Sequence, residues 1–211
     1  MALDRNWIAP ARTALVLIDM QVDFALPDGA LGRQGFDMTA AQAAVKKAQS
    51  LTEAARRAGV AVVFVRLITR SEDDTPAQRE YRARRAPSDA PLCAEGTRGA
   101  ELVGPMPQAG DYVVSKTRYS GFTATRLEES LRAMGRDTLV IAGLTTECCV
   151  AATAWDAFER DFQIFIAADA VAAYQPDLHE GALKALNLNC ALLFSTQEIA
   201  AAWDGQANSE A

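Results

Sequence analysis

The stretch that decides the fold runs from residue 137 to residue 156, DTLVIAGLTTECCVAATAWD. Its first part, residues 138–141, is a short β-branched and aliphatic run, as expected for a strand buried on both faces. Gly143 ends that run, and the apolar residues after it recur at helical spacing. Two thiols, Cys148 and Cys149, therefore lie in the predicted first turn of a helix, just past a strand end. Open α/β sheets commonly bind ligands at that position.

The predicted position of the thiols also has a chemical consequence. The first turn of a helix carries N–H groups without helical partners and the positive end of the helix dipole. Both favour a thiolate, and both favour an oxyanion that develops during a reaction. The stretch therefore predicts a functional site as well as a fold.

The rest of the chain alternates strand and helix patterns. Apolar runs predict further strands at residues 13–19, 60–65, 111–115, 162–168 and 190–194. Helical spacing or composition predicts helices at residues 39–58, 77–85, 123–134 and 178–188, and a last short helix that ends at Trp203. Parallel strands joined by right-handed helical crossovers form a sheet covered on both faces. We therefore predict a three-layer α/β/α fold, a Rossmann-like parallel six-stranded sheet, in one domain over residues 1–211.

Two segments depart from the alternation. Residues 66–110 are polar, rich in arginine and proline, and without a sustained period. We expect this segment, called the excursion below, to pass over the edge of the sheet where the strands end, because such loops often contact substrates. Its basic run, AQREYRARR, is interpreted as a solvated helical face. Residues 204–211 are expected to form a disordered tail.

Composition excludes several functional classes. The net charge of −6 over 211 residues argues against nucleic acid or an anionic membrane as a partner. No apolar run approaches the ~20 residues that span a bilayer, and the amino terminus lacks the layout of a signal peptide. The four cysteines show no CxxC spacing, which favours reduced thiols. We expect a soluble cytoplasmic protein.

The chain has a single histidine, His179. A histidine-based zinc site, a Ser–His–Asp triad and a Cys–His dyad all need a suitably placed imidazole. His179 lies in PDLHEGALKAL, where a helix is expected to start, and a surface or helix-start role is the simplest interpretation. We therefore predict neither histidine chemistry nor a metal site.

Three predicted strand ends bring complementary groups to one edge of the sheet. Asp19 ends the first strand, Lys116 follows the third, and Cys148 or Cys149 follows the central one. A thiol of ordinary pKa, ~8.5, needs a nearby cation or base to react at neutral pH. A carboxylate and an ammonium supply both without histidine. Neighbouring helical residues point ~100° apart, so we expect only one thiol to face the edge, and periodicity does not decide which.

Three pieces of the sequence resemble the isochorismatase-like cysteine hydrolases: LVLIDMQVDF, VSKTRYSGFTATRLEESLRAMG and GLTTECCVAATAWDA. The resemblance covers nearly the whole chain, and it implies a catalytic set of Asp19, Lys116 and Cys149. It also implies a cis peptide bond between Leu144 and Thr145. The N–H groups of Thr145 and Cys149 would then form an oxyanion hole. Cys148, which lies outside this set, is most simply a small apolar residue.

Within that family, KTRYSGF and TTECCV look most similar to ureidoacrylate, biuret and carbamoyl-type amidohydrolases. The resemblance implies that a thioester intermediate forms, that ammonia leaves from a small ureido, carbamoyl or amide substrate, and that no cofactor takes part. The substrate-binding candidates are Phe24, Arg118, Tyr119, Tyr174 and Gln175, and each can equally be structural. Carbamoylsarcosine-type relatives place an arginine for a carboxylate where this chain has Tyr174 and Gln175. That departure suggests a neutral or amide-rich substrate, although Arg118 could still bind an acid.

Three alternatives stay open at this stage. An isochorismatase-type enzyme hydrolyses a vinyl ether with the residues that match Asp19 and Lys116, without the cysteine. A nicotinamidase-like amidase is a second possibility, although that branch carries a metal-binding Asp and His cluster and this chain has one histidine. A small-molecule binder is the third. The family also implies a homodimer or homotetramer.

Overall fold

The computed structural model describes residues 1–84 and 91–207. In these ranges six strands form one sheet in the order β3-β2-β1-β4-β5-β6, and every neighbouring pair is parallel. The predicted fold class is confirmed. The strands are β1 (Thr13–Ile18), β2 (Ala61–Leu67), β3 (Tyr112–Lys116), β4 (Thr138–Leu144), β5 (Gln163–Ala172) and β6 (Ala191–Phe194).

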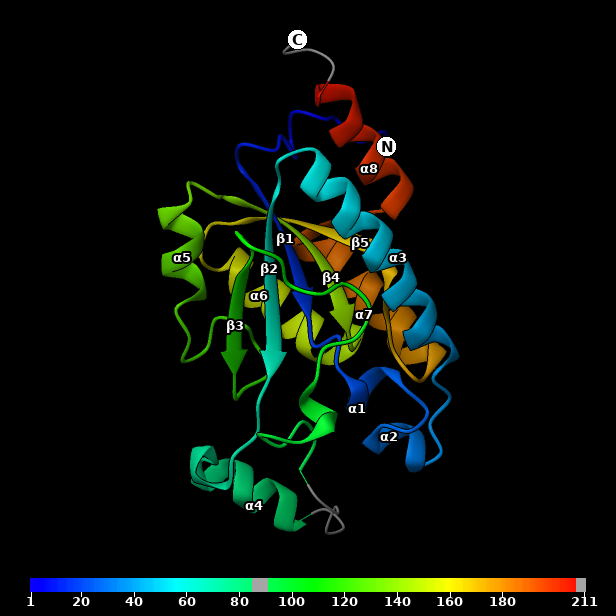
Figure 1. The fold of residues 1–211 in the computed structure, drawn as a ribbon, viewed down its shortest axis with the longest axis vertical. Helices are drawn as coiled ribbons and strands as arrows, with labels where there is room; N and C mark the ends of the chain where they lie inside the picture. The colour runs from blue at the N-terminus through cyan, green and yellow to red at the C-terminus, as the bar shows by residue number, and fades with distance from the viewer. Residues whose placement is uncertain (85–90, 208–211) are drawn as a thin grey trace.

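Helices cover both faces of the sheet (Figure 1). Alternate residues of β1 point to opposite faces, as the period of two in a strand requires. Leu15 and Leu17 belong to the core on one face, whereas Val16 and Ile18 belong to the core on the other. The first core is covered by α3 (Thr39–Arg57) and α8 (Thr196–Ala207), and the second by α5 (Leu127–Ala133), α6 (Ala151–Phe158) and α7 (Pro176–Asn189).

The two central strands approach each other closely at one glycine. Ile18 of β1 pairs with Gly143 of β4. Gly143 has a φ of 136°, and a Cβ there would lie 2.1 Å from the carbonyl oxygen of Ile18. Only glycine allows that approach. We expected Gly143 to end the strand, but β4 continues through it to Leu144.

The carboxyl ends of the strands point to one edge of the sheet, called the carboxyl edge below. Three short helices lie there: α1 (Val22–Ala25), α2 (Ala30–Arg33) and α4 (Pro76–Arg84) (Figure 1). The helix α4 belongs to the excursion, together with short 3₁₀ turns at Ser71–Asp73 and Arg98–Ala100. The helices α1 and α2 were not predicted, because the turn residues between them suggested a loop.

Buried Gln21 joins the excursion to the end of β2. Its side-chain amide donates to the carbonyl oxygens of Leu67 (2.8 Å) and Ala100 (3.0 Å). Its side-chain oxygen accepts from the N–H of Leu67 (2.8 Å). One side chain therefore satisfies three backbone groups, two at the end of β2 and one at Ala100 later in the excursion.

Several helix and strand ends differ from the predicted ones. The helix predicted from residue 123 begins at Leu127, because Ala124 has a φ of 57° and Thr125 Oγ1 donates to the carbonyl of Gly121. The strand β5 continues past a register shift opposite β4, so Asp169 lies inside a strand and not in a loop.

The carboxyl-terminal helix is longer than expected. Buried Trp203 donates its indole N–H to the carbonyl of Ile8 (3.0 Å), and α8 continues beyond this anchor to Ala207. The expected disordered tail, residues 204–211, thus begins inside a helix. Residues 208–211 lie outside the described residues, as does Arg85, the predicted last residue of the helix seen as α4.

None of the helices in the two described ranges is both long and apolar enough to cross a lipid bilayer.

Candidate active site

Asp19 and Lys116 form a fully buried ion pair at the carboxyl edge. Asp19 directly follows β1 with a φ of 50°, and its N–H donates to the carbonyl of Val65 in β2 (2.8 Å). Lys116 is the last residue of β3. Its Nζ lies 2.7 Å from Asp19 Oδ2, and both side chains are 0% exposed. The pair therefore links β1 to β3 across the end of β2, which lies between them in the sheet.

Cys149 reaches the same place from a third segment. It lies in a single π-helical turn, Thr146–Val150, between β4 and α6. The carbonyl of Thr145 accepts from the N–H groups of both Cys148 and Val150, at 3.1 Å each. Lys116 Nζ donates to Cys149 Sγ at 3.4 Å. The structure thus brings together the carboxylate, the ammonium and the thiol that were predicted to meet.

The environment sets the resting protonation of this cluster. Burial raises the pKa of the Asp19 carboxyl, against the opposing effects of Lys116 and Cys149. Burial disfavours the charged form of Lys116, but the charges of Asp19 and Cys149 and their hydrogen bonds outweigh burial and raise its pKa. A hydrogen bond with Cys148, burial and the Asp19 charge raise the pKa of the Cys149 thiol. The cluster therefore combines a thiol that is harder to ionise than usual with a carboxyl group that is more basic than usual.

Lys116 and Cys149 line a cavity of about 300 Å³, called the Cys149 cavity below. The predicted residues Phe24, Arg118 and Tyr119 also line it. So does Thr145, whose N–H group we predicted to form an oxyanion hole with that of Cys149. The Leu144–Thr145 peptide bond is cis in the structure.

Two other predicted residues, Tyr174 and Gln175, line a neighbouring cavity of about 280 Å³, called the Tyr174 cavity below. Phe24, Thr145 and Cys148 line both cavities and so form the wall between them. The Tyr174 hydroxyl donates to the carbonyl of Phe24 (2.7 Å). The structure therefore connects Tyr174 to the Cys149 cavity through Phe24, and it does not bring Tyr174 or Gln175 into that cavity.

Both neighbouring thiols face the Cys149 cavity, which corrects the expectation that only one would. Cys148 is half-buried and lines the cavity together with Cys149. The expectation assumed the ~100° step of an α-helix, but these residues lie in a wider π turn. The hydrogen bond with Cys149 lowers the pKa of the Cys148 thiol. Cys148 therefore lines the cavity and also packs against the core on its side of the sheet.

The guanidinium of Arg118 is held by oxygens that carry no net charge. It donates to the carbonyl and hydroxyl of Thr117 (3.0 and 3.1 Å) and to the carbonyl of Asp73 (3.0 Å). These contacts fix Arg118 in the cavity wall without neutralising its charge. An arginine held in this way suits an anionic group of a ligand.

The individual residues that the excursion adds to the cavity wall were not predicted. The excursion contributes Asp74, Gln78 and Arg82, the last two from α4, and also Pro91 and Leu92. A signal was present in the basic run AQREYRARR, which we interpreted as solvated. The run contributes Gln78 and Arg82 to the cavity wall because it lies over the carboxyl edge. Sequence spacing does not show that contact.

The single histidine lies at the start of a helix, as predicted. His179 is in the first turn of α7, and its Nδ1 lies 2.8 Å from Thr146 Oγ1 in the π turn. Within residues 1–84 and 91–207, no group of three or more His, Cys, Asp or Glu side chains is arranged to hold a metal ion.

Comparison with known proteins places the chain in a family. The isochorismatase domain model matches residues 13–198. The chain is 35% identical over 187 residues to "Ureidoacrylate amidohydrolase RutB" of Methylobacterium radiotolerans, covering 82% of this chain and 72% of that protein. The crystal structure of a cysteine hydrolase from Pseudomonas syringae pv. phaseolicola matches with a TM-score of 0.82 at 28% identity, over 94% of this chain and 95% of that one. N-carbamoylsarcosine amidase from Thermoplasma acidophilum matches with a TM-score of 0.69 at 32% identity, over 88% and 96%. This chain belongs to the isochorismatase family, as its three sequence motifs indicate.

Proposed function

We propose that this protein is a cysteine-dependent amidohydrolase that cleaves a C–N bond of a small ureido, carbamoyl or amide compound and releases ammonia. One observation carries the proposal: the Lys116 ammonium lies 2.7 Å from Asp19 and 3.4 Å from Cys149 at the wall of a cavity. The bond class is supported by two relatives, one named a ureidoacrylate amidohydrolase and one an N-carbamoylsarcosine amidase.

In the first half of the reaction, Asp19 accepts the proton of the Cys149 thiol while the sulfur attacks the substrate carbonyl carbon. The raised pKa of Asp19 makes its carboxylate a stronger base for this step. Lys116 stays protonated and offsets the negative charge. The N–H groups of Thr145 and Cys149 stabilise the oxyanion of the tetrahedral intermediate. The C–N bond then breaks, the nitrogen takes the proton from Asp19, and ammonia leaves a thioester on Cys149.

In the second half, water hydrolyses the thioester. Asp19, again a carboxylate, accepts a proton from the water as its oxygen attacks the same carbonyl carbon. The C–S bond breaks, and the proton returns from Asp19 to the sulfur. The net reaction adds one water and releases one acid and one ammonia, so the residues end in their starting protonation states.

The walls of the Cys149 cavity support a small substrate that carries an acidic group. A volume of about 300 Å³ suits a small molecule. Phe24 and Tyr119 supply apolar walls, and Arg118 supplies a cation for an acidic group of the substrate. The Tyr174 hydroxyl supports Phe24 through a hydrogen bond to its carbonyl. Gln175 lines the neighbouring cavity. A reducing compartment such as the cytoplasm keeps a thiol nucleophile free, and the cysteine spacing favours reduced thiols.

The test is ammonia release from ureidoacrylate, biuret, carbamoyl amino acids, maleamate and nicotinamide, with EDTA present. Wild type is compared with Cys149→Ser and with Cys190→Ser. Cys190 is a matched control, because its thiol is also buried but does not line the cavity. We expect turnover of at least one ureido or amide compound by wild type and by Cys190→Ser, and none by Cys149→Ser.

Four results would contradict the proposal. Full activity of Cys149→Ser would remove the thiol from the mechanism, and hydrolysis of a vinyl ether by that variant would indicate isochorismatase-type chemistry. Activity on nicotinamide that EDTA abolishes would indicate a metal-dependent amidase. No ammonia from any compound, with the protein folded, would leave a binding role.

A further inference from the structure

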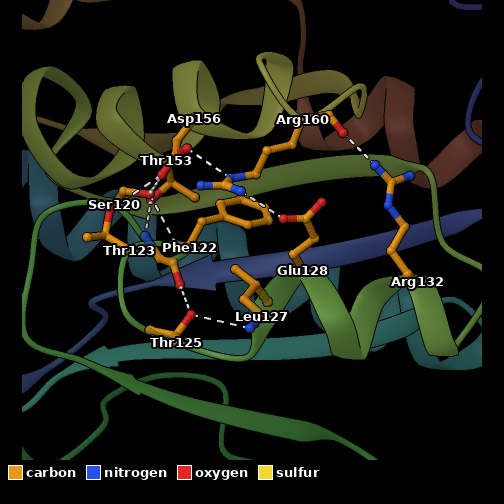
Figure 2. A network of polar contacts seen from close by, with 11 residues as sticks. Ser120, Phe122, Thr123, Thr125, Leu127, Glu128, Arg132, Thr153, Asp156 and Arg160 are labelled. Atoms are coloured by element: carbon orange, nitrogen blue, oxygen red, sulfur yellow. Dashed lines mark hydrogen bonds and ion pairs between the residues drawn. The ribbon is translucent and has the colours of Figure 1, made fainter.

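The loop between β3 and α5 is fastened to α6 by polar side chains on one face of that helix. Figure 2 shows Ser120, Phe122 and Thr123 of the loop facing Thr153, Asp156 and Arg160 of the helix region. The loop begins directly after Lys116, and the turn that precedes α6 carries Cys149. The network therefore connects the segment that holds the ammonium to the segment that holds the thiol.

Thr153 makes the most direct of these connections. It is 0% exposed. Its hydroxyl donates to the carbonyl of Cys149 (2.7 Å) and accepts from the N–H of Gly121 (3.0 Å). One hydroxyl group thus bridges the backbone of the proposed nucleophile and the backbone of the loop.

Asp156 makes a second connection one helical turn further on. Its Oδ2 accepts from Ser120 Oγ (2.6 Å), and the same Ser120 oxygen accepts from the N–H of Phe122 (3.0 Å). Arg160 donates to Asp156 Oδ1 (2.9 Å) and to Glu128 of α5 (2.8 Å). The Asp156 carboxylate is therefore held from both sides, and it holds the loop in turn.

The loop packs closely against the sheet, α5 and α6 at Gly121. A Cβ at Gly121 would lie 3.2 Å from side-chain atoms of both Leu127 and Val65, and 3.5 Å from Thr153 Cγ2. Gly121 is thus enclosed by the sheet, by α5 and by α6. Because of this close packing, we expect loss of the hydrogen bond between the Gly121 N–H and Thr153 to displace the whole loop.

The orientation of the ammonium depends on this loop. Besides Asp19 and Cys149, the Lys116 ammonium contacts the carbonyl of Arg118 (3.0 Å), which lies in the loop. Displacement of the loop relative to α6 would change the distance between Lys116 Nζ and Cys149 Sγ. That distance controls how strongly the ammonium stabilises a thiolate.

We propose that Thr153 is a positioning residue that fixes the distance between Lys116 and Cys149 by tying the β3–α5 loop to the helix of the nucleophile. The effect on turnover rests on the proposed function. The effect on the reactivity of the Cys149 thiol does not, because it can be measured without a substrate.

The test compares Thr153→Val, which removes the hydroxyl and keeps the branched shape, with Thr153→Ser, which keeps the hydroxyl. Thr52→Val is a matched control. Thr52 is also 0% exposed and also donates to the carbonyl four residues before it, that of Ala48 (2.7 Å), but in α3, away from the cavity. Each variant is checked for folding by circular dichroism and urea unfolding.

The first measurement is alkylation of Cys149 by iodoacetamide as a function of pH, with the modified thiol located by tandem mass spectrometry. Asp19, Lys116 and Cys148 act most directly on the Cys149 thiol, and Tyr119 and Tyr174 also interact with it. The charged side chains of Asp74, Arg82 and Arg118 line the same cavity. All of these residues stay unchanged. We expect alkylation at neutral pH to become about tenfold slower in Thr153→Val, as one unit of thiol pKa would cause. Thr153→Ser and Thr52→Val should keep the wild-type profile.

The second measurement is steady-state turnover of the compound that wild type hydrolyses. We expect kcat of Thr153→Val to fall about 10- to 100-fold, since small displacements of reacting groups have effects of that size. KM should change less than kcat, because Thr153 does not line the cavity. A wild-type alkylation profile and kcat in folded Thr153→Val would overturn the inference.

A further variant covers the case in which Thr153→Val does not fold. Ser120→Ala removes the second connection and should slow alkylation in the same direction by a smaller factor, so an unchanged profile would then overturn the inference. If the alkylation results are as expected but no compound is hydrolysed by wild type, the proposed function fails and the positioning role stands.

Discussion

The ends of the central strands and the excursion line the same cavity but differ in how firmly they are held. Asp19 and Lys116 are 0% exposed, and each is fixed by contacts to other strands. In contrast, α4 of the excursion has no buried residue, although Gln78 and Arg82 line the cavity. The proposed reacting groups thus lie where packing permits one arrangement, whereas part of the proposed substrate-facing wall lies where side chains can change at little cost. In the proposed mechanism, the reaction and part of the substrate recognition therefore depend on different regions.

The largest expected effect is that of Lys116→Met, which leaves the buried Asp19 carboxylate without its partner. We expect the free energy of unfolding at neutral pH to fall by about 3–5 kcal/mol, together with loss of turnover. Without Lys116, the folded-state pKa of Asp19 rises further above its unfolded value of about 3.9. The loss of stability should therefore be smallest below about pH 3.9, grow as pH rises from there toward the folded-state pKa, and level off above it. Urea unfolding across pH measures this. The double variant Asp19→Asn/Lys116→Met should recover most of the stability, and failure to do so would contradict the role of the pair.

The pH dependence of kcat/KM is the next largest effect. The mechanism needs ionised Asp19 and a protonated Cys149 thiol at the start. Burial raises the pKa of Asp19, so activity should fall, as pH decreases, at a value above the ordinary ~3.9. The raised pKa of Cys149 places the basic limb above ~8.5. An acidic limb at or below the ordinary value for aspartate would argue against Asp19 as the base.

Replacing Gln21, which connects the excursion to the end of β2, should have a smaller effect on stability. Gln21→Leu removes the partners of the Leu67 N–H and of two carbonyls, and each unsatisfied buried group costs about 1–3 kcal/mol. We expect lower stability and faster proteolysis within the excursion, because its connection to β2 is lost. Gln49→Leu on the exposed surface of α3 serves as the control. Cleavage of the excursion at the wild-type rate would show that Gln21 does not hold it.

The smallest effect on stability is expected within α4. Arg82 and Arg84 both form ion pairs on the surface, with Asp74 and Glu80, but only Arg82 lines the cavity. Alanine at either position should change the free energy of unfolding by less than about 0.5 kcal/mol. Arg82→Ala should raise KM several-fold and Arg84→Ala should leave it unchanged. Equal KM values in the two variants would remove α4 from substrate binding.

The contrast between the central strands and the excursion also explains which features could be predicted from the sequence. The central strands are continuous β-branched and aliphatic runs, because parallel strands are buried on both faces, and this made their positions readable. Asp19 and Lys116 directly follow or end such runs, so their meeting at one edge follows from the parallel arrangement alone. The predicted three-layer fold and its family were confirmed for this reason.

The features that were not predicted depend on particular hydrogen bonds and on positions in space, neither of which the spacing of residue types shows. The π turn at Cys149 is closed by the hydrogen bond from the Val150 N–H to the carbonyl of Thr145, five residues earlier. The helical period of the sequence does not show this bond. The start of α5 is delayed by bonds from Thr125 and Ser120 to a neighbouring turn and helix. The division into two cavities depends on where Phe24 lies in space. Local spacing carries none of this information.

The order of strands in the sheet has a consequence for synthesis on the ribosome. β1 is the first strand to be made, yet it lies in the middle of the sheet between β2 and β4. All six of its residues are buried in the finished protein, and β4 follows only at Thr138. Until then a nascent chain can pair β1 with β2 but leaves an apolar edge open, which is the kind of surface that aggregates or recruits chaperones. Asp19 and Lys116 can meet in such an incomplete chain, but Cys149 joins them only after β4 has been translated.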